Sequence, residues 1–222
     1  MLTRGRRSQG LTIVLLIGAA FSLATLVARL GAFHLPGNHQ GYAPKQPIAF
    51  SHRLHAGELL IDCKYCHYGA ESSRHAGIPA TSVCMNCHSI VTDTLGSLRA
   101  EDKSAKEEKR KARRMVSAEL QKLYDSLGLD ESMKPRADRV PKPIEWIKVH
   151  NLPDFVYFNH SAHVNASVAC DRCHGAVETM ERVRQVKDLS MGWCVNCHRT
   201  VNRIGVAGKT VHASLDCGAC HY

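Results

Sequence analysis

Aromatic residues are scarce in this sequence of 222 residues, where Phe, Tyr and Trp together account for 6%. Large aliphatic residues are scattered, apart from one apolar stretch near the N-terminus. Burial of apolar surface is the main favourable contribution to folding, so a chain of this composition would form only a thin core unaided. The composition therefore argues against a fold that side-chain packing alone stabilises.

No cysteine of the chain stands outside a motif, because all ten fall into five Cys-x-x-Cys-His motifs. The five motifs are Cys63, Cys66 and His67; Cys84, Cys87 and His88; Cys170, Cys173 and His174; Cys194, Cys197 and His198; and Cys217, Cys220 and His221. Two thiols at this spacing can each add across a vinyl group of protohaem, and the histidine that follows becomes the proximal ligand of the iron. We therefore predict five covalently bound c-type haems. These haems would supply the missing core volume, and without them the chain should be largely unfolded.

Cysteine pairs also occur in zinc sites and in disulfide frameworks. Zinc knuckles combine two pairs, or one pair with a downstream histidine couple, and five pairs cannot be divided evenly in this way. A disulfide framework suits an exported chain but gives no reason for a histidine after every second cysteine. The repeated histidine favours haem over both alternatives.

The formal charge of +9, taken alone, is typical of proteins that bind nucleic acid or anionic membranes. Each haem, however, carries two propionates, so five haems would contribute about −5 when oxidised and about −10 when reduced. The protein with haem would then be nearly neutral, and its Arg and Lys side chains would have propionates as partners. We therefore expect no nucleic-acid partner.

The longest apolar stretch comprises residues 11–28, eighteen residues without a charge that follow Arg4, Arg6 and Arg7. Such a length is just sufficient for a helix to cross the hydrocarbon layer, and basic residues before it favour a cytoplasmic N-terminus. The alternative is a cleavable signal peptide, for which the small-residue cleavage site is weak. We expect a single-pass anchor in a bacterial inner membrane, with the haem-binding part in the periplasm.

The distribution of motifs and charges predicts five segments. They are a cytoplasmic tip and transmembrane anchor at 1–30, a linker at 31–47, a dihaem module at 48–92, a charged helical insertion with a linker at 93–145, and a trihaem module at 146–222. The insertion is predicted to be a solvated helix, and it either only separates the modules or docks a neighbouring subunit. We expect a mainly α-helical fold with much irregular structure, wrapped around five haems.

Each module contains the phrase Phe-x-His-x-x-His ahead of its first attachment motif, at Phe50–His55 and at Phe158–His163. Histidines three residues apart on a helical turn have neighbouring but different bearings, so the two can address different irons. We predict His52, His55, His160 and His163 as distal ligands. His52 and His160 would each serve the haem of the motif that follows next, and the second histidine of each phrase would reach another haem.

The fifth distal ligand is left open by the sequence. The candidates are His75, His150, Met180 and Met191, with His212 as a weaker one. Methionine would raise the potential of that haem, whereas Met191 lies so close to Cys194 that packing explains it equally well. Nine histidines lie outside the motifs, so the supply exceeds the five ligands needed, and we expect no open catalytic iron.

The motifs and the residues around them resemble a known family, the pentahaem cytochrome c subunit of bacterial alternative complex III. The segments that carry this resemblance are Phe50–His55, His75–His88, Trp146–Phe155, Phe158–His163 and Met191–Cys194. The paired-histidine phrase is also similar to that of class III cytochromes c, which implies ligation by two histidines. The charged insertion lies outside the resemblance.

The resemblance implies an electron-transfer subunit of a quinol-oxidising respiratory or photosynthetic complex. Its partners would be an iron–sulfur subunit, quinol-binding membrane subunits and a monohaem cytochrome c, and its electrons would pass to a soluble cytochrome c or copper protein. Quinol oxidation itself would belong to other subunits. Two other hypotheses remain, a freestanding membrane quinol dehydrogenase and a multihaem reductase of a small oxyanion, although none of the five motifs is altered as such reductases usually require.

Overall fold

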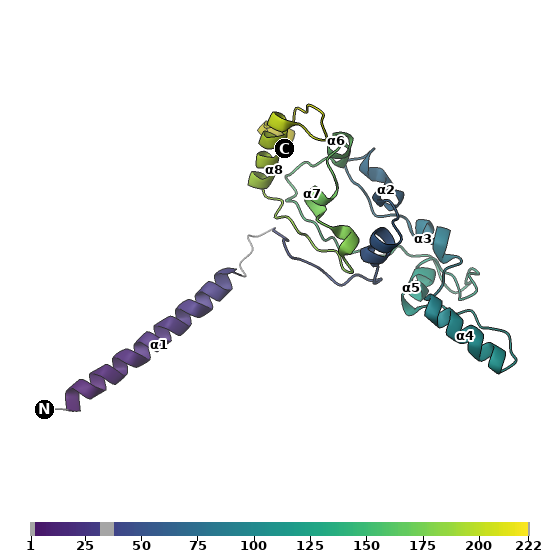
Figure 1. The fold of residues 1–222 in the computed structure, drawn as a ribbon, viewed down its shortest axis with the longest axis horizontal. Coiled ribbons are helices and arrows are strands. Elements are labelled where there is room, and N and C mark those ends of the chain that lie inside the picture. Colours follow the sequence, from purple (N-terminus) through teal and green to yellow (C-terminus); the bar gives the residue numbers. More distant parts are fainter. Residues whose placement is uncertain (1–2, 32–37, 222) are drawn as a thin grey trace. The chain divides into compact units, whose positions relative to one another are not determined.

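The computed structural model describes residues 3–31 and 38–221, which divide into two compact units, residues 1–38 and residues 39–222. The first unit is the helix α1, Thr3–Gly31 (Figure 1). Leucine, a good helix former, is the commonest residue of this stretch and proline is absent from it, which favours a long helix. The structure does not show the membrane anchor that we expected there. Within the described residues no helix is long and apolar enough to cross a membrane.

The second unit consists of short helices joined by irregular segments. They are η1 (Arg53–Glu58), α2 (Cys63–Cys66), η2 (Tyr68–Ala70), α3 (Thr81–His88), α4 (Leu95–Glu107), α5 (Ala118–Ser126), α6 (His160–Asn165), α7 (Asp171–His174), η3 (Val177–Thr179), α8 (Met191–Ile204) and η4 (Cys217–Ala219). In the described residues β-structure is limited to three isolated bridges. The fold is therefore mainly helical and irregular, as the sequence predicted.

Polar side chains begin several of the helices that carry haem motifs. Asp62 accepts a hydrogen bond from the Lys64 N–H at α2, Ser190 accepts one from the Trp193 N–H at α8, and Asp216 does the same for Gly218 at η4. Such caps satisfy N–H groups that have no partner within the helix. They stabilise the first turns of α2, α8 and η4, whereas α3 and α7 begin without a side-chain cap.

The buried core of side chains is small. Among the described residues, the buried apolar side chains are Ala70, Ala105, Leu123 and Tyr124, and the buried polar ones are Thr92 and Gln185. Leu123 and Tyr124 lie on α5, which packs against α3. The Tyr124 hydroxyl donates a hydrogen bond of 2.6 Å to the His88 carbonyl. The expectation of a thin core therefore holds for this part of the chain.

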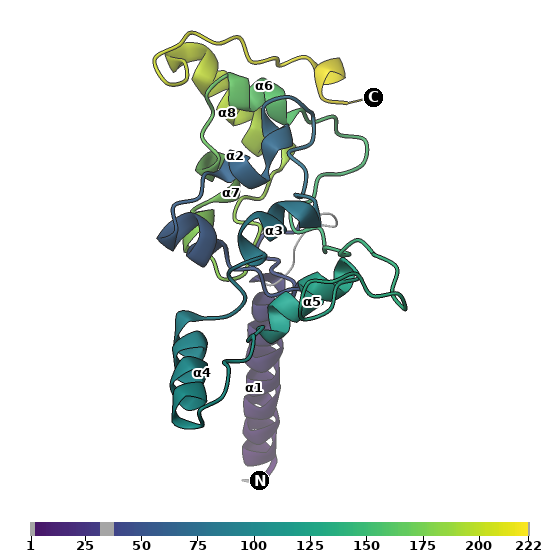
Figure 2. The ribbon, with the colours of Figure 1, turned by 90° about the vertical axis from the view of Figure 1, so that its right-hand side faces the viewer.

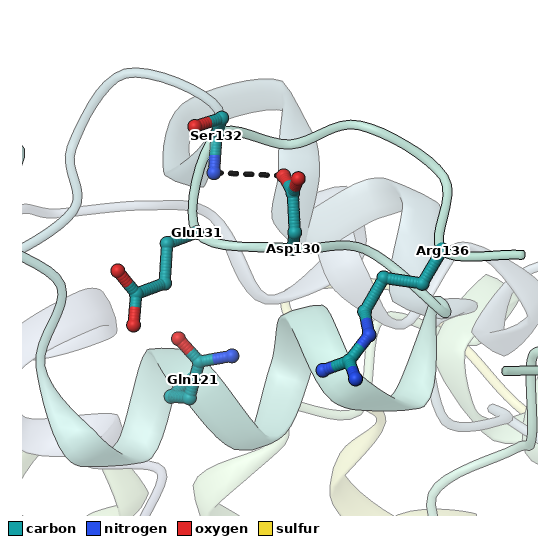
Figure 3. Close-up of a pocket in the computed structure, with 5 residues that line it drawn as sticks. All are labelled: Gln121, Asp130, Glu131, Ser132 and Arg136. Carbon is teal, nitrogen blue, oxygen red and sulfur yellow. Dashed lines mark hydrogen bonds between the residues drawn. The ribbon is translucent and has the colours of Figure 1, made fainter. Parts of the chain in front are cut away.

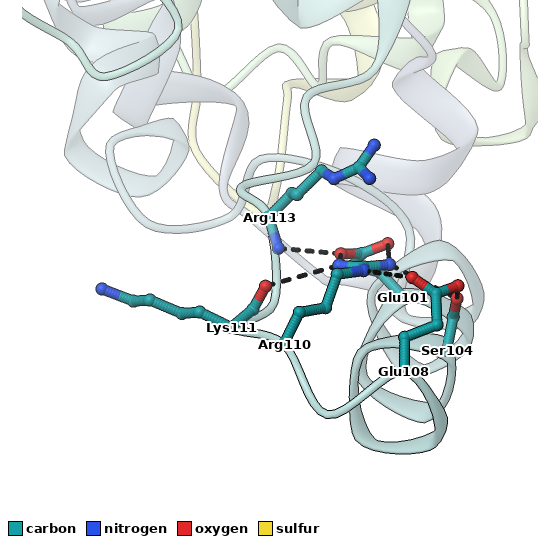
Figure 4. Close-up of polar contacts among 6 residues, drawn as sticks. All are labelled: Glu101, Ser104, Glu108, Arg110, Lys111 and Arg113. Atoms are coloured by element: carbon teal, nitrogen blue, oxygen red, sulfur yellow. Dashed lines mark hydrogen bonds and ion pairs between the residues drawn. The ribbon is translucent and has the colours of Figure 1, made fainter.

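The charged insertion differs from the single solvated helix that we expected, because the chain breaks between α4 and α5. Lys109 has a φ of 53°, and Arg110 turns back to pair with Glu101 and Glu108. Figure 4 shows this cluster, in which Glu101 also accepts the N–H of Arg113. These contacts hold the irregular segment after α4 against that helix, and α5 begins beyond it at Ala118.

Candidate functional site

Among the residues that the structure describes, four pairs of histidine rings have centroids 6.1 to 6.5 Å apart, and two of these pairs are almost parallel. The ring centroids of His52 and His67 are 6.5 Å apart with an interplanar angle of 3°, and those of His160 and His174 are 6.4 Å apart at 6°. A metal–imidazole bond is about 2 Å long, so two rings that share one iron have centroids about 6 Å apart. Each pair therefore has the spacing of two axial ligands.

The second histidine of each phrase faces a different motif. His55 lies 6.1 Å from His88 at an interplanar angle of 60°, and His163 lies 6.1 Å from His198 at 35°. The structure thus brings each of the four predicted distal histidines to a separate attachment histidine. The first member of each phrase meets the next motif along the chain, and the second member meets the motif after that.

The phenylalanine of each phrase contacts both of its histidines. Phe50 stacks on His55 with a centroid distance of 4.3 Å and meets His52 edge-on at 4.9 Å. Phe158 does the same with His163 at 4.5 Å and His160 at 4.8 Å. One aromatic ring therefore fixes the angle between the two imidazoles, which explains the Phe-x-His-x-x-His pattern.

Backbone carbonyls accept hydrogen bonds from the Nδ1 atoms of most of these rings. The pairs are His55 with Ser51 (2.8 Å), His163 with Asn159 (2.8 Å), His160 with Arg74 (2.9 Å), His67 with Gly77 (2.7 Å), His88 with Val91 (2.8 Å) and His198 with Ser214 (2.6 Å). A carbonyl only accepts, so the proton lies on Nδ1 and the lone pair lies on Nε2. This is the tautomer and orientation that a metal ligand needs.

Burial keeps several of the imidazoles neutral. It is the main cause that lowers the pKa of His52 to about 4, followed by His67 and His55, and it lowers the pKa of His174 to about 4, followed by His150 and His160. Only a neutral imidazole binds a metal ion. In addition, the buried Nδ1 of His52 has no hydrogen-bond partner among the described residues. The donor set fits haem iron in its chemistry and spacing.

The segments that we predicted as the two haem modules contact each other at two places. The Arg53 N–H donates to the Met180 carbonyl (3.0 Å), while the Ser161 N–H donates to the Ser73 carbonyl (3.1 Å). Thus η1 packs against η3, and α6 packs against η2. At the first contact a Cβ on Gly57 would lie 2.2 Å from the Glu178 carbonyl oxygen, so only glycine permits this approach. Each paired-histidine phrase therefore rests on the segment that follows the first motif of the other module.

Burial raises the pKa of the Cys63, Cys66, Cys84, Cys173 and Cys194 thiols, and a nearby thiol of another motif adds to this increase in each case. The pairs are Cys66 with Cys84 and Cys87, Cys63 with Cys170, Cys173 with Cys197 and Cys194, and Cys194 with Cys220. In Figures 1 and 2, α3 and α8 lie on opposite sides of α2 and α7. The attachment motifs therefore follow one another in space in the order of His88, His67, His174, His198 and His221.

Comparison with known proteins agrees with this geometry. Residues 156–222 match the family described as cytochrome c7 and related cytochrome c. The chain is also 26% identical over 197 residues to the protein named menaquinone reductase, multiheme cytochrome c subunit, from Nitratidesulfovibrio vulgaris, with 80% of this chain and 77% of that protein covered. The chain is a multihaem cytochrome c. The resemblance to the subunit of alternative complex III is not shown by these matches.

The candidates for the fifth distal ligand of this cytochrome differ in their exposure to solvent and in their contacts. His75 is exposed, and Met191, 69% exposed, begins α8. Met180 is half-buried and its carbonyl serves Arg53, as described above. His221, the fifth attachment histidine, has Phe155 as its ring neighbour at 5.7 Å. The choice among these candidates stays a prediction.

His150 contacts an attachment histidine, although in a way that the sequence did not suggest. Its ring centroid is 4.4 Å from that of His174 at an interplanar angle of 84°, and its Nε2 lies 3.2 Å from the His174 Nδ1. This position is behind the ring, on the side away from His160. From this position His150 would not be the second axial ligand of an iron held by His174.

Gln185 is a further residue that the sequence analysis missed. Its side chain is fully buried, accepts the Asn151 N–H (2.9 Å) and donates to the Lys187 carbonyl (2.9 Å). Its backbone also pairs with Tyr42 and Gly41. No local sequence signal marks this glutamine, because its partners are brought to it from two distant segments.

The cytochrome also has a shallow surface pocket, which lies in the insertion (Figure 3). Its lining residues are Gln121, Asp130, Glu131, Ser132 and Arg136. The Ser132 N–H donates to Asp130 across 2.8 Å, so part of the polar surface is already satisfied internally. None of the lining residues is a histidine or cysteine, and we assign the pocket no role.

Proposed function

We propose that this cytochrome binds five haems and relays electrons within a membrane-associated quinone oxidoreductase complex. The observation that carries the proposal is the set of four facing imidazole pairs, with ring centroids 6.1 to 6.5 Å apart. An iron with protein ligands on both axial sides has no vacant position for a substrate. The arrangement therefore suits conduction of electrons better than conversion of a substrate.

In this proposal the ten cysteines attach the haems, and the histidine of each motif is the proximal ligand. The distal ligands are His52 for the His67 motif, His55 for the His88 motif, His160 for the His174 motif and His163 for the His198 motif. Once bound, each haem supplies a one-electron carrier whose iron alternates between the ferric and ferrous states. The carbonyls that accept from Nδ1 hold the ligand rings in place and increase the electron donation of Nε2.

The spatial order of the motifs supports a relay with two ends. One end is the His88 motif, which lies under α5 through the bond from Tyr124. The other end is the His221 motif near the C-terminus. A linear order means that the three inner sites pass electrons between these ends, and partners should dock at the outer sites.

The nature of the complex is inferred from the two relationships. The relative from N. vulgaris is a subunit of a menaquinone reductase, and the family resemblance implies a quinol-oxidising complex with an iron–sulfur subunit and quinol-binding membrane subunits. Both relationships connect a multihaem cytochrome with a quinone pool. We propose quinone-active subunits, and a soluble periplasmic electron carrier, as the partners of this chain.

Attachment to the membrane part of the complex is the proposed role of α1. Its consecutive side chains Ile13, Val14, Leu15, Leu16 and Ile17 are all more than half exposed. Successive residues of a helix are about 100° apart, so these five cover every face. An apolar turn that is exposed on every side needs apolar partners, and we propose that the membrane subunits of the complex supply them.

The test uses the detergent-solubilised complex. A pyridine haemochrome assay should give five haems per polypeptide, and electron paramagnetic resonance should give predominantly low-spin iron. Stopped-flow mixing with a reduced menaquinone analogue, or with a reduced soluble cytochrome, distinguishes quinol oxidation from quinone reduction. Markedly fewer than five haems, or a dominant high-spin iron that binds nitrite or hydroxylamine, would contradict the proposal and favour an oxyanion reductase.

A further inference from the structure

The His174 motif has an unusual hydrogen bond behind its attachment histidine. His67, His88 and His198 each direct Nδ1 at a backbone carbonyl, at distances of 2.6 to 2.8 Å. His174 instead directs its Nδ1 at the Nε2 of His150, 3.2 Å away. One of these four sites therefore has an imidazole as its acceptor where the other three have an amide.

The geometry defines which nitrogen carries each proton. His160 faces His174 at a centroid distance of 6.4 Å with nearly parallel rings, so the iron side of His174 is its Nε2 side. With Nε2 bound to iron, the His174 proton must lie on Nδ1, and His174 is the donor. His150 then accepts through Nε2, and its own proton lies on Nδ1.

An imidazole nitrogen is a much stronger base than an amide carbonyl oxygen. Histidine has an ordinary pKa of about 6.5, whereas a backbone amide does not protonate in water near neutral pH. The stronger acceptor draws the Nδ1 proton further from His174 and gives the ligand more anionic character. Anionic character stabilises the ferric state over the ferrous state, and hydrogen bonding around the ligands is one of the means by which a protein sets a haem potential.

We propose that His150 is a positioning residue that lowers the reduction potential of the haem attached at Cys170 and Cys173. This inference rests on the haem ligation given under the proposed function, and it is independent of the identity of the partners. The His174 motif is the middle one of the five in space. The acceptor therefore acts on the site through which every electron that crosses the whole relay must pass.

The loop that carries His150 is held by a buried group. The N–H of the next residue, Asn151, donates to the Gln185 side chain across 2.9 Å, and Gln185 is fully buried. The side-chain amide of Gln185 donates a hydrogen bond to the Lys187 carbonyl, and the Gln185 backbone forms hydrogen bonds with Tyr42 and Gly41. These contacts restrain the position of His150, so its approach to His174 does not depend on a mobile side chain alone.

The experiment compares His150→Ala and His150→Gln with the wild-type holocytochrome by spectroscopic redox titration and electron paramagnetic resonance. In His150→Ala, one of the five potentials should become more positive, by an amount that raises the reduced-to-oxidised ratio of that haem about tenfold at fixed ambient potential, which is about 59 mV for one electron. The iron should stay low-spin. His150→Gln offers an amide acceptor and should give a smaller shift of the same sign.

The control variant is Ser132→Ala, which changes an exposed, uncharged side chain of the insertion that is no candidate ligand and should leave all five potentials unchanged. Five low-spin haems with unshifted potentials in both His150 variants, or a shift to more negative values, would overturn the inference while leaving the proposed function intact. If His150→Ala does not assemble, His150→Gln decides the matter by the same criterion. A wild-type protein with fewer than five haems would instead overturn the proposed function.

Discussion

Gly57 lies in η1 where this helix packs against η3, and its replacement by alanine is a strong test of the contact between the two predicted haem modules. A Cβ at this position would lie 2.2 Å from the Glu178 carbonyl oxygen and 3.3 Å from its carbon. The contact atom belongs to the backbone and cannot rotate away, so η1 would have to retreat by about 1 Å to restore an ordinary contact. Overpacking of this kind costs about 1–3 kcal/mol.

The displacement matters because η1 carries or adjoins two of the proposed ligands. His52 precedes η1 and His55 lies within it, and metal–ligand distances tolerate a change of only about 0.2 Å. A retreat of about 1 Å should therefore remove the distal ligand from the His67 iron, the His88 iron or both. The ligands supplied by α6 to the other module should stay in place, because they do not depend on η1.

The assay measures haem content, spin state and thermal unfolding of Gly57→Ala beside Gly96→Ala. Gly96 lies in α4, where a Cβ would meet only a side-chain oxygen of Thr94 at 3.8 Å, so this control should keep wild-type spectra. For Gly57→Ala we expect one or two of five irons to become high-spin and Tm to fall by about 2–4 °C per kcal/mol lost. Five low-spin irons together with a wild-type Tm would refute the reasoning.

Three further predictions concern single side chains. His52→Ala should convert one iron of five to a high-spin form that binds carbon monoxide, and retention of five low-spin irons would contradict its role. Tyr124→Phe should lower the free energy of unfolding by about 1 kcal/mol, since the fully buried hydroxyl donates to the His88 carbonyl; a wild-type Tm would count against this. Glu101 has its pKa lowered from 4.5 to about 2, first by its hydrogen bond with Arg110 and then by the Arg113 N–H. The depressed pKa means that Glu101 stabilises the insertion above about pH 4.5 and loses this effect as the pH falls toward 2. The protection factors of the α4 amides against hydrogen exchange should therefore fall as the pH is lowered across that window, and Glu101→Gln should abolish this pH dependence.

The attachment motifs and the paired-histidine phrases were predictable because their chemistry is local. Two thiols and a histidine within five residues form a haem attachment sequence wherever they occur. The phrase Phe-x-His-x-x-His places two imidazoles on one helical turn with a fixed angle between them. The facing partners of His52 and His160 also followed from their short separation along the chain.

The insertion illustrates where sequence patterns were insufficient. Charge density between Glu101 and Leu127 predicted one solvated helix, yet Arg110 pairs back to Glu101 and interrupts it. A helical pattern counts neighbours three and four residues apart, whereas this ion pair joins residues nine apart. Its geometry depends on the turn at Lys109, whose positive φ no charge pattern indicates.

His150 and Gln185 show a second limit. In the sequence alone, His150 is a candidate ligand and Gln185 is an ordinary polar residue. Their roles appear only when the segment after Trp146 and the segment around Gln185 come together beside His174. Hydrogen bonds across 24 and 34 residues depend on the path of the whole chain.

The sequence by itself determined the number of haem attachment motifs, the histidines available as ligands and the shortage of side-chain core, because each is a matter of residue type and short spacing. Only the tertiary structure decided the spatial order of the motifs, the contacts between the predicted modules and the acceptor behind His174. Those features arise from contacts between segments that the chain brings together over long distances, and the free energy of such contacts is not encoded in any single stretch.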